Sequence, residues 1–504
     1  MINTRLRLTG AALPGVGLAG LLQLCAVDAA HAVEFSFMDK QVTGSIDTTL
    51  SYGRMWRVQG RDKSNDDVNT NDGNRNFDTG LVSEVYKITS ELEANYQNYG
   101  LFMRGTGFYD TQLMDKRNNY YDNNSPSQPS QSYPQDDRFT SQTRDIAGSR
   151  IEMLDAYVHG SWDVAQMPVT ARVGRQVFNW GEGIFYRGGI NTTNPVDAAK
   201  YRLPGAEVKE VLVPVEALSF NVGLTDSLTM ESFYQTNWKE TRIDPVGTFY
   251  SQTDLFADGG NTGYNNFSGT ALDTPVPGFG NVIGLYSALG NNPLLSSALQ
   301  TTGLYANGVT PAYGNTLKVA SIGKDYNARN DGQFGFAFRY IAEQLNSTEF
   351  GLYMVNYHAK EPTIAADLGG YKGIDMDALT NLLSGVAGDQ AGALAGGLAT
   401  ADVMGNIQAH RRYAEDIRMY GFSFNTTLGE ASVFGEIAYR PNLPIGVAAT
   451  NDLIGDLANG AAVAVTGRSI NVGGQMVNLN SEINNAERVE AFNTSLGTIY
   501  NFGP

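Results

Sequence analysis

Residues 42–52 read VTGSIDTTLSY, and apolar and polar side chains alternate through this stretch. Val42, Ile46, Leu50 and Tyr52 fall on one face, whereas Thr, Ser and Asp side chains fill the other. A period of two residues is typical of a β-strand whose two faces meet different surroundings. The alternation returns in segments of roughly ten residues, which very short and very long polar connections join in turn. Together these features predict a transmembrane antiparallel β-barrel.

The first 32 residues predict a cleaved secretory signal peptide. Two arginines precede an apolar stretch from Leu8 to Val27, and the run Ala30-His31-Ala32 has the small-x-small pattern of a cleavage site. The alternative is a membrane anchor helix, but Pro14 and four glycines interrupt the stretch. We therefore expect residues 33–504 to form the barrel.

The composition of the mature chain excludes several classes of protein. The only cysteine, Cys25, lies in the signal, which leaves no thiol for a disulfide or a thiolate metal site. Cleavage removes two arginines and one aspartate, so the net charge changes from −17 to −18. A strongly acidic exported chain is a poor ligand for nucleic acid. No mature stretch approaches the ~20 apolar residues of a membrane helix.

The period of two predicts twelve strands, at about 42–55, 85–96, 100–110, 150–162, 168–178, 216–224, 228–238, 333–342, 348–357, 416–426, 431–440 and 486–500. Connections of a few residues, rich in Asn, Asp, Gly, Ser and Thr, are expected to be periplasmic turns. The long polar connections are expected to face outward, at 56–84, 111–149, 179–215, 239–332, 358–415 and 441–485. A secreted β-sandwich or solenoid is the alternative, but neither fold explains why short and long connections alternate so regularly.

The rows of aromatic and aliphatic side chains are assigned to the lipid. They include Phe334, Phe336, Phe338 and Tyr340 in one strand, and Leu154, Ala156, Val158 and Trp162 in another. A charge on the lipid face costs a few kcal/mol, so the polar side chains between these rows are expected to line the lumen. The predicted pore-lining residues are Arg104, Asp155, His159, Arg172, Gln176, Glu182, Glu231, Gln235, Arg339, Glu436 and Arg440.

Two of the long connections contain apolar residues at helical spacing. They are the stretch from Phe279 to Leu299 and the stretch from Met376 to Val386, and both predict short amphipathic helices on the outer side. One interpretation is that each helix folds over the barrel mouth as a structural cap. The other is a landing surface where an apolar solute binds before it enters the barrel.

Three blocks of sequence carry a resemblance to a known family. They are GRQVFNWGE at 174–182, NPVD at 194–197 and LPGAEVKE at 203–210, and the likeness continues through 71–78, 233–238, 243–247 and 435–442. The chain resembles the proteobacterial outer-membrane family catalogued as domain of unknown function 1302. The resemblance implies an outer-membrane protein with a periplasmic lipoprotein-like partner and an inner-membrane transporter of the resistance-nodulation-division type. It implies no reaction, cofactor or settled substrate.

Members of that family continue beyond the point where this chain stops, at 501–504. We therefore expect a sequence that lacks its last strands, with 42–55 and 486–500 as the two edges of the barrel. A closed barrel of twelve strands is the alternative.

Catalytic chemistry finds little support in the sequence. His159, His358 and His410 are far apart and no His-Glu-x-x-His pattern occurs, so no catalytic metal site is predicted. An inward His159 beside Asp155 is the single candidate for a barrel hydrolase, weighed against an ordinary lumen histidine. The acidic run from Asp66 to Gly73 resembles a calcium loop, but its glycine stands one place late, which favours hydrogen-bonded loop turns.

The turn Trp180-Gly181-Glu182-Gly183, together with Arg187, has two interpretations. It either folds back into the lumen as a constriction or forms an ordinary loop anchor. The sequence as a whole predicts a channel, without enzymatic activity, for a hydrophobic or amphiphilic, lipid-like molecule. The alternatives are a non-conducting structural or adhesive barrel and, less favoured, a barrel lipid hydrolase.

Overall fold

The computed structural model of the 504-residue chain describes residues 33–65, 67–120, 130–183, 188–446, 470–472, 475–478 and 481–500. The predicted signal peptide, Asp66, Arg187 and residues 501–504 lie outside these ranges. No helix among the described residues is long and apolar enough to cross a membrane.

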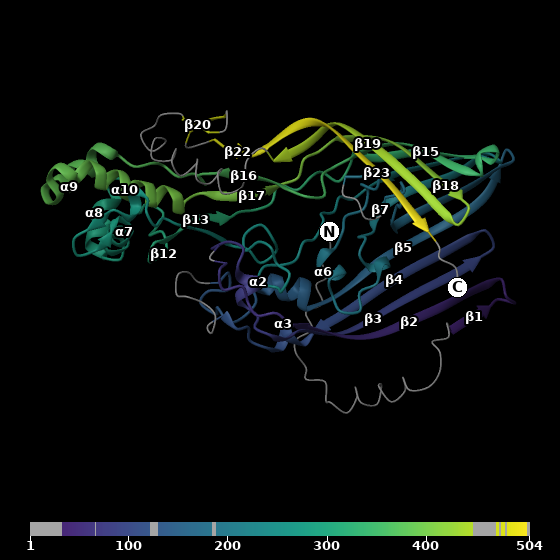
Figure 1. Ribbon diagram of the computed structural model, residues 1–504, viewed down its shortest axis with the longest axis horizontal. Helices are drawn as coiled ribbons and strands as arrows, with labels where there is room; N and C mark the ends of the chain where they lie inside the picture. The colour runs from purple at the N-terminus through teal and green to yellow at the C-terminus, as the bar shows by residue number, and fades with distance from the viewer. Residues whose placement is uncertain are drawn as a thin grey trace, which may run out of the picture.

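The chain folds as an antiparallel β-barrel, as the alternation predicts. One sheet of thirteen strands forms its wall, and each strand pairs with the next wall strand along the chain (Figure 1). The wall strands are β1 (Val33–Phe37), β2 (Val42–Arg57), β3 (Gly80–Tyr96), β4 (Tyr99–Asp110), β5 (Ser149–Val164), β6 (Met167–Gln176), β7 (Val215–Thr225), β8 (Leu228–Gln235), β14 (Gln333–Ala342), β15 (Thr348–Tyr357), β18 (Ile417–Leu428), β19 (Ala431–Gly446) and β23 (Ala486–Tyr500). The short turns gather at one end of the barrel, which we call the turn end.

Twelve of these strands correspond to predicted ones, and β14, β15 and β23 begin and end where the sequence placed them. The prediction missed β1, which pairs with β2 from Val33 opposite Ile46 to Phe37 opposite Val42. The edge strand is therefore β1, and residues 42–46 of the expected edge are covered. The strand β1 has only five residues and lies beside the predicted cleavage site, and five residues are too few to show a period of two.

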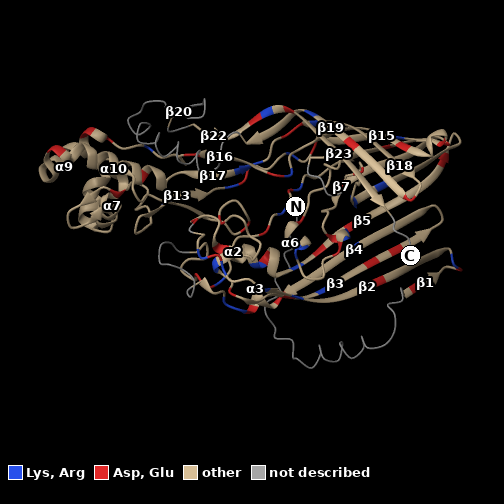
Figure 2. Cartoon of the chain, viewed as in Figure 1, with Lys and Arg blue, Asp and Glu red and all other residues tan. Residues whose placement is uncertain are grey.

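The two faces of the wall differ as predicted. Outward aromatic and aliphatic side chains are exposed on strand after strand, among them Tyr52, Val173, Phe338 and Phe422. The remaining exposed members of this band include Ile46, Leu50, Tyr86, Ile88, Val158, Trp162, Phe220, Phe336, Tyr340, Leu352, Tyr420, Ile437, Phe492 and Leu496. Figure 2 shows acidic and basic positions spaced along β3, β4 and β5.

The outward assignment of Leu154 is wrong, because its side chain is only 2% exposed. Met103 pairs with Ala156 and Gly105 pairs with Met153, so two residues of β5 lie opposite Arg104 alone. This β-bulge shifts the phase of the alternation by one residue. Before the bulge, Met153 therefore faces outward. After the bulge, Ala156 and Val158 face outward.

The long connections build a separate lobe at the end opposite the turns (Figure 1). Its sheet has the order β12-β13-β17-β16-β22, with β9 paired to β13. These strands are β9 (Thr262–Asn266), β12 (Ala312–Tyr313), β13 (Thr316–Ile322), β16 (Thr363–Asp367), β17 (Gln408–Arg412) and β22 (Ile483–Asn484). Two further pairs are β10 (Pro275–Val276) with β11 (Gly280–Asn281), and β20 (Ile470–Val472) with β21 (Gln475–Val477). The sequence predicted all of these as loop.

Four helices pack on this sheet: α7 (Val282–Gly290), α8 (Pro293–Gln300), α9 (Met376–Ala387) and α10 (Ala391–Gly405). Their shared core includes Tyr286, Leu379 and Leu398. The helical prediction is thus confirmed, but the two segments fold as one body. Figure 1 shows the helices at the far end of the lobe, away from the wall, so the interpretation as a cap across the barrel mouth is wrong.

Shorter helical turns occur in the other connections, in the turn between β14 and β15, and within the lobe. They are α2 (Asp72–Arg75), α3 (Thr111–Asp115), α5 (Ser141–Thr143), α6 (Ala198–Tyr201), η1 (Arg144–Gly148), η2 (Val208–Glu210), η3 (Ala271–Asp273), η4 (Glu343–Leu345) and η5 (Gly388–Gln390).

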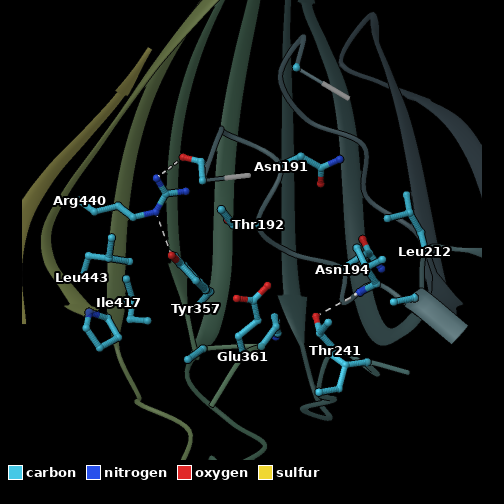
Figure 3. A pocket seen from close by; sticks show the side chains of 18 of the residues that line it. Asn191, Thr192, Asn194, Leu212, Thr241, Tyr357, Glu361, Ile417, Arg440 and Leu443 are labelled. Carbon is cyan, nitrogen blue, oxygen red and sulfur yellow. Dashed lines mark hydrogen bonds between the residues drawn. The ribbon is translucent and has the colours of Figure 1, made fainter. Parts of the chain in front are cut away.

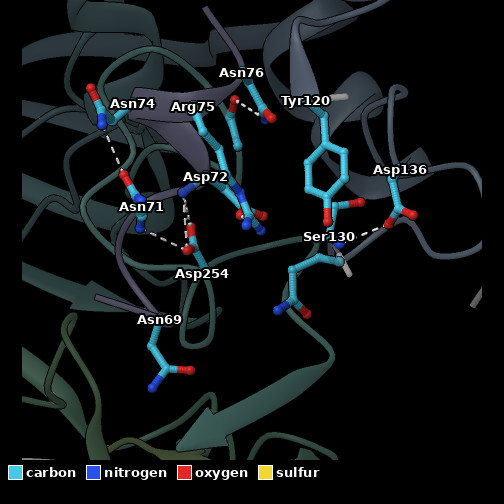
Figure 4. A network of polar contacts seen from close by, with 12 residues as sticks. Asn69, Asn71, Asp72, Asn74, Arg75, Asn76, Tyr120, Ser130, Asp136 and Asp254 are labelled. Carbon is cyan, nitrogen blue, oxygen red and sulfur yellow. Dashed lines mark hydrogen bonds and ion pairs between the residues drawn. The ribbon is translucent and has the colours of Figure 1, made fainter. Parts of the chain in front are cut away.

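A buried polar network joins the connection after β2 to the base of the lobe (Figure 4). The carboxylate of Asp254 accepts hydrogen bonds from the backbone N–H groups of Asn71, at 2.9 Å, and Asp72, at 3.1 Å. Asn69 exchanges two hydrogen bonds with the backbone of Tyr264, at 2.8 and 3.0 Å. Burial raises the pKa of Asp254, because its charged form loses contact with water and lies near Asp72.

The acidic run that resembles a calcium loop forms hydrogen-bonded turns, as favoured. Asn65 accepts from the N–H of Asp67 at 3.1 Å, and Asp67 accepts from the N–H of Asn69 at 2.7 Å. Such turns use the side-chain oxygens that a cation needs as ligands. Among the described residues no group of three or more metal-binding side chains gathers.

Candidate functional site: a loop inside the barrel

The described parts of the connection between β6 and β7, residues 177–183 and 188–214, fold into the lumen, and we call them the internal loop. It contains the blocks NPVD and LPGAEVKE in full. It also contains the block GRQVFNWGE except for residues 174–176, which belong to β6. Its first half lies against the inner face of β8, β14, β15, β18 and β19, and its second half lies against β2, β3 and β5.

Trp180 anchors the first half. Its indole N–H donates to Glu231 at 2.7 Å, and its ring packs 5.1 Å from that of Phe233 and 6.1 Å from that of Tyr353. Gly335 of β14 provides the space, because a Cβ there would stand 2.8 Å from the indole ring. The predicted lumen residue Glu231 is therefore a partner of the internal loop.

Glu436 of β19 binds the backbone of the internal loop at three points. Its carboxylate accepts from the N–H groups of Glu182 at 2.8 Å, Gly183 at 3.1 Å and Ile190 at 3.1 Å. Charge-assisted hydrogen bonds of this kind are about twice as strong as neutral ones. Gly181 has φ +85° and lies so close that a Cβ would stand 2.6 Å from the Glu436 carboxylate.

Arg440 lies four residues farther along the same strand and binds the loop through its carbonyl groups. It donates to the oxygens of Gly188 and Gly189, both at 2.5 Å, and to the Tyr357 hydroxyl at 2.9 Å (Figure 3). Its side chain is almost completely buried. Glu436 and Arg440 thus hold the described residues on both sides of 184–187, and neither presents a free charge to the lumen.

The Glu182 side chain points at β18, the strand next to β19. Its carboxylate accepts from Asn425 at 3.0 Å and from Ser423 at 3.4 Å. Ile190 packs against Gly421, where a Cβ would stand 2.8 Å from the isoleucine side chain. Of the two interpretations of the turn at 180–183, the fold-back into the lumen matches this geometry.

The second half is held by a buried ion pair. The Lys87 ammonium lies 2.6 Å from the Glu210 carboxylate, and both side chains are almost fully buried. Lys87 also donates to the carbonyl oxygen of Gly205 at 2.7 Å, and the Thr89 hydroxyl donates to Glu210. Each buried charge therefore has more than one partner, which offsets the free energy lost on leaving water.

A second charged cluster ties α6 to β5. Arg150 lies 2.5 Å from Asp197, Arg242 lies 3.1 Å from Glu152, and Lys200 is paired with Glu152. Burial, together with the neighbouring arginines, lowers the pKa of Lys200 to about 7. Asp197 also accepts from the backbone N–H of Lys200 and caps the helix.

Cavities lie on two sides of the internal loop. The larger, of about 770 Å³, faces the lobe and is lined by residues that include Asn191, Thr192, Glu361 and Leu443 (Figure 3). The smaller, of about 410 Å³, lies nearer the turn end and is lined by residues that include Arg172. We call them the upper and lower chambers.

The other predicted pore-lining residues differ in their surroundings. Arg104 donates to Glu91 at 3.0 Å and to Asp155 at 2.9 Å. Asp155 pairs with Arg104, and among the described residues no hydrogen bond joins Asp155 to His159. Arg172 is exposed and lies 5.4 Å above the ring of Tyr157.

Two predicted residues are buried within the wall. Gln176 donates to the carbonyl of Ala217 at 2.9 Å and accepts from Ser219 at 2.7 Å. Gln235 donates to the carbonyl of Asn237 at 2.6 Å. Arg339 lies on the inner face, 2.8 Å from Glu349, and lines the lower chamber with Gln176 and Glu231.

The sequence reasoning missed Lys87, Glu210 and Tyr357. Lys87, Thr89 and Glu91 alternate with Tyr86 and Ile88, so the period of two carried the signal for the inner face of β3. Glu210 and Tyr357 carried no such signal, because their partners come from distant parts of the chain.

Structural comparison finds similar bacterial proteins at low TM-scores. OccK2 (OpdF) of Pseudomonas aeruginosa aligns with a TM-score of 0.25 and 6% identity, over 81% of this chain and 68% of that one. OccAB2 of Acinetobacter baumannii aligns with a TM-score of 0.28 and 9% identity, over 82% and 70%. The outer membrane protein OpdK of Pseudomonas aeruginosa aligns with a TM-score of 0.23 and 7% identity, over 80% and 67%.

Sequence comparison gives a definite family. No curated protein matches the chain. The profile of the family described as "Protein of unknown function (DUF1302)" matches residues 13–503, nearly the whole chain, which confirms the resemblance carried by the motifs of the internal loop. The chain belongs to the DUF1302 family.

Proposed function

We propose that this protein is an outer-membrane channel whose passage is narrowed by the internal loop. The observation that carries the proposal is the position of this loop between the upper and lower chambers, with contacts to both halves of the wall. An exposed apolar band on the outer face supports a membrane location, because such a band is stable only against lipid.

The proposed cargo is a hydrophobic or amphiphilic, lipid-like molecule. The upper chamber combines apolar walls, such as Leu212, Ile417 and Leu443, with polar groups such as Asn191 and Thr192. A molecule with an apolar body and a polar end matches such a lining. Directed movement needs an energy source, and the proposed partners are a periplasmic lipoprotein-like protein and a resistance-nodulation-division transporter.

Single-channel recording in planar bilayers tests the proposal. Glu436→Gln removes the charge that binds three backbone N–H groups, so we expect the internal loop to loosen and the conductance or open time to rise several-fold. Glu349→Gln is the matched control, because this inward carboxylate on β15 pairs with Arg339 and makes no hydrogen bond to the described residues of the internal loop. Equal currents from the wild type and both variants would contradict a constriction made by the loop.

Cargo is tested separately in liposomes. The purified barrel should raise the uptake of a neutral lipophilic dye above that of protein-free liposomes, and the Glu436→Gln variant should raise it further. Uptake equal to that of empty liposomes would count against passage of this class of molecule.

A second candidate is a non-conducting structural or adhesive barrel. The many contacts of the internal loop, above all the buried pair of Lys87 and Glu210, favour it. Persistent electrical silence after both Glu436→Gln and Glu210→Gln would support this second function.

A further inference from the structure

The lobe contains a cavity of about 610 Å³ between α10 and the segment that leads from β9 to α7. Its apolar lining includes Leu272, Val276, Val282, Leu394 and Met404. Volumes of this size are typical of sites for small ligands, which range from about 300 to 1,000 Å³.

No charged side chain lines this cavity among the described residues. Its polar lining consists of Thr270, Thr274, Thr400 and Gln390, all of them neutral. The upper chamber differs, because Arg202, Asp244, Lys360, Glu361 and Arg440 are among its lining residues. An ion would leave water for the lobe cavity without a counter-charge, which is strongly unfavourable.

The helix α10 leaves room at this cavity by means of its glycines. Gly397 is close to its neighbour, since a Cβ there would stand 2.8 Å from Val282. Gly396 lines the cavity, and a Cβ there would meet no atom within 4 Å. The side of α10 at Gly396 therefore borders open volume. An apolar occupant gains dispersion contacts with the apolar walls of this cavity.

We infer that the lobe cavity binds an uncharged apolar molecule. It is a site on the outer side of the barrel, distinct from the two chambers at the internal loop. Binding at this site extends the proposed function. Only the later passage of the bound molecule through the barrel rests on that function. The four neutral polar groups in the lining fit a ligand with few hydrogen-bonding groups.

Photolabelling of the full chain in lipid nanodiscs tests the inference. The probe is the neutral 3-(trifluoromethyl)-3-(m-iodophenyl)diazirine, and mass spectrometry locates the labelled peptides. We expect labelling at 390–404 and 267–282 in addition to the lipid-facing strands. Gly396→Leu places a side chain in the cavity, and it should reduce the lobe labelling at least five-fold while labelling of the strands stays unchanged.

Gly392→Leu is the matched control. Gly392 lies on the same helix, also has no atom within 4 Å of a Cβ, and does not line the cavity. Both variants replace a glycine of α10 by the same helix-favouring residue. Lobe labelling that is absent from the wild type, or unchanged in a folded Gly396→Leu protein, would overturn the inference. Conductance of the same protein preparations is recorded in planar bilayers, so a closed channel with a labelled lobe rejects the proposed function alone.

Discussion

Glu436 and Arg440 show how single residues act inside the barrel. Each is buried, and each is matched to backbone groups of the internal loop, so the carboxylate meets N–H donors and the guanidinium meets carbonyl oxygens. Buried charges are tolerated only when they are hydrogen-bonded in this way. The sequence identified both residues as inward charges from the period of two. Their partners could not be predicted, because these lie some 250 positions earlier in the chain.

Lys360 is a buried charge of a different kind. It lines the upper chamber, and its ammonium donates to Gln333 at 2.7 Å, without a carboxylate within 4 Å among the described ion pairs. Burial lowers the pKa of Lys360 to about 7. The unfolded chain, where lysine titrates near 10.4, therefore binds more protons between pH 7 and 10. Its contribution to the free energy of unfolding rises with pH across this window.

We predict that Lys360→Met stabilises the folded barrel below pH 7, by a few kcal/mol at about 1.4 kcal/mol per pKa unit. The advantage should shrink as the pH rises from 7 to 10. Urea unfolding in detergent at pH 6 and pH 9.5 measures it, with the exposed Lys372→Met as the control. A variant that is less stable than the wild type at pH 6 would contradict the account.

At the scale of elements, the wall was predictable and the lobe was not. Wall strands must present one face to lipid and one to the lumen, so their sequences alternate over many residues. The strands of the lobe, such as β13 and β16, have five to seven residues and pack within a small mixed core, which leaves no sustained period. The bulge at Leu154 escaped prediction because one additional residue changes the pairing without changing the composition.

The contact between η2 and β3 gives a prediction about the ion pair of Lys87 and Glu210. Removing one partner leaves a buried charge unpaired, so Glu210→Leu should lower the free energy of unfolding by about 3–5 kcal/mol. The double variant Lys87→Met with Glu210→Leu removes both charges, and it should recover most of the loss. Chemical unfolding of the three proteins measures the coupling, and a double variant that is no more stable than the single one would refute it.

The contact between β18 and the internal loop gives a prediction about Gly421. Gly421→Val places atoms where Ile190 packs, so the loop should leave the wall and become open to trypsin at Lys200, Arg202 and Lys209. Gly105→Val is the control, because this glycine pairs with the outward Met153 and so lies on the outer face of β4, away from the internal loop, and a Cβ there meets nothing closer than 3.7 Å. Equal protection of 188–214 in both variants would show that Ile190 does not hold the loop.

At the scale of the whole molecule, the structure combines three parts with different surroundings. The wall carries an apolar outer band, the lumen holds a polar loop with buried ion pairs, and the lobe has its own apolar core. A compact soluble protein would bury its large aromatic side chains, whereas Phe338, Phe422 and Phe492 stay exposed on the wall. This arrangement requires two solvents, hydrocarbon outside and water inside.

Electron paramagnetic resonance along β6 tests that requirement most directly. Spin labels are placed one at a time at Val169, Thr170, Ala171, Arg172 and Val173, in a mature chain whose predicted form has no cysteine of its own. In liposomes, labels at 169, 171 and 173 should relax with oxygen dissolved in lipid, and labels at 170 and 172 with a water-soluble nickel complex. Five labels with equal access to the nickel complex would contradict the account.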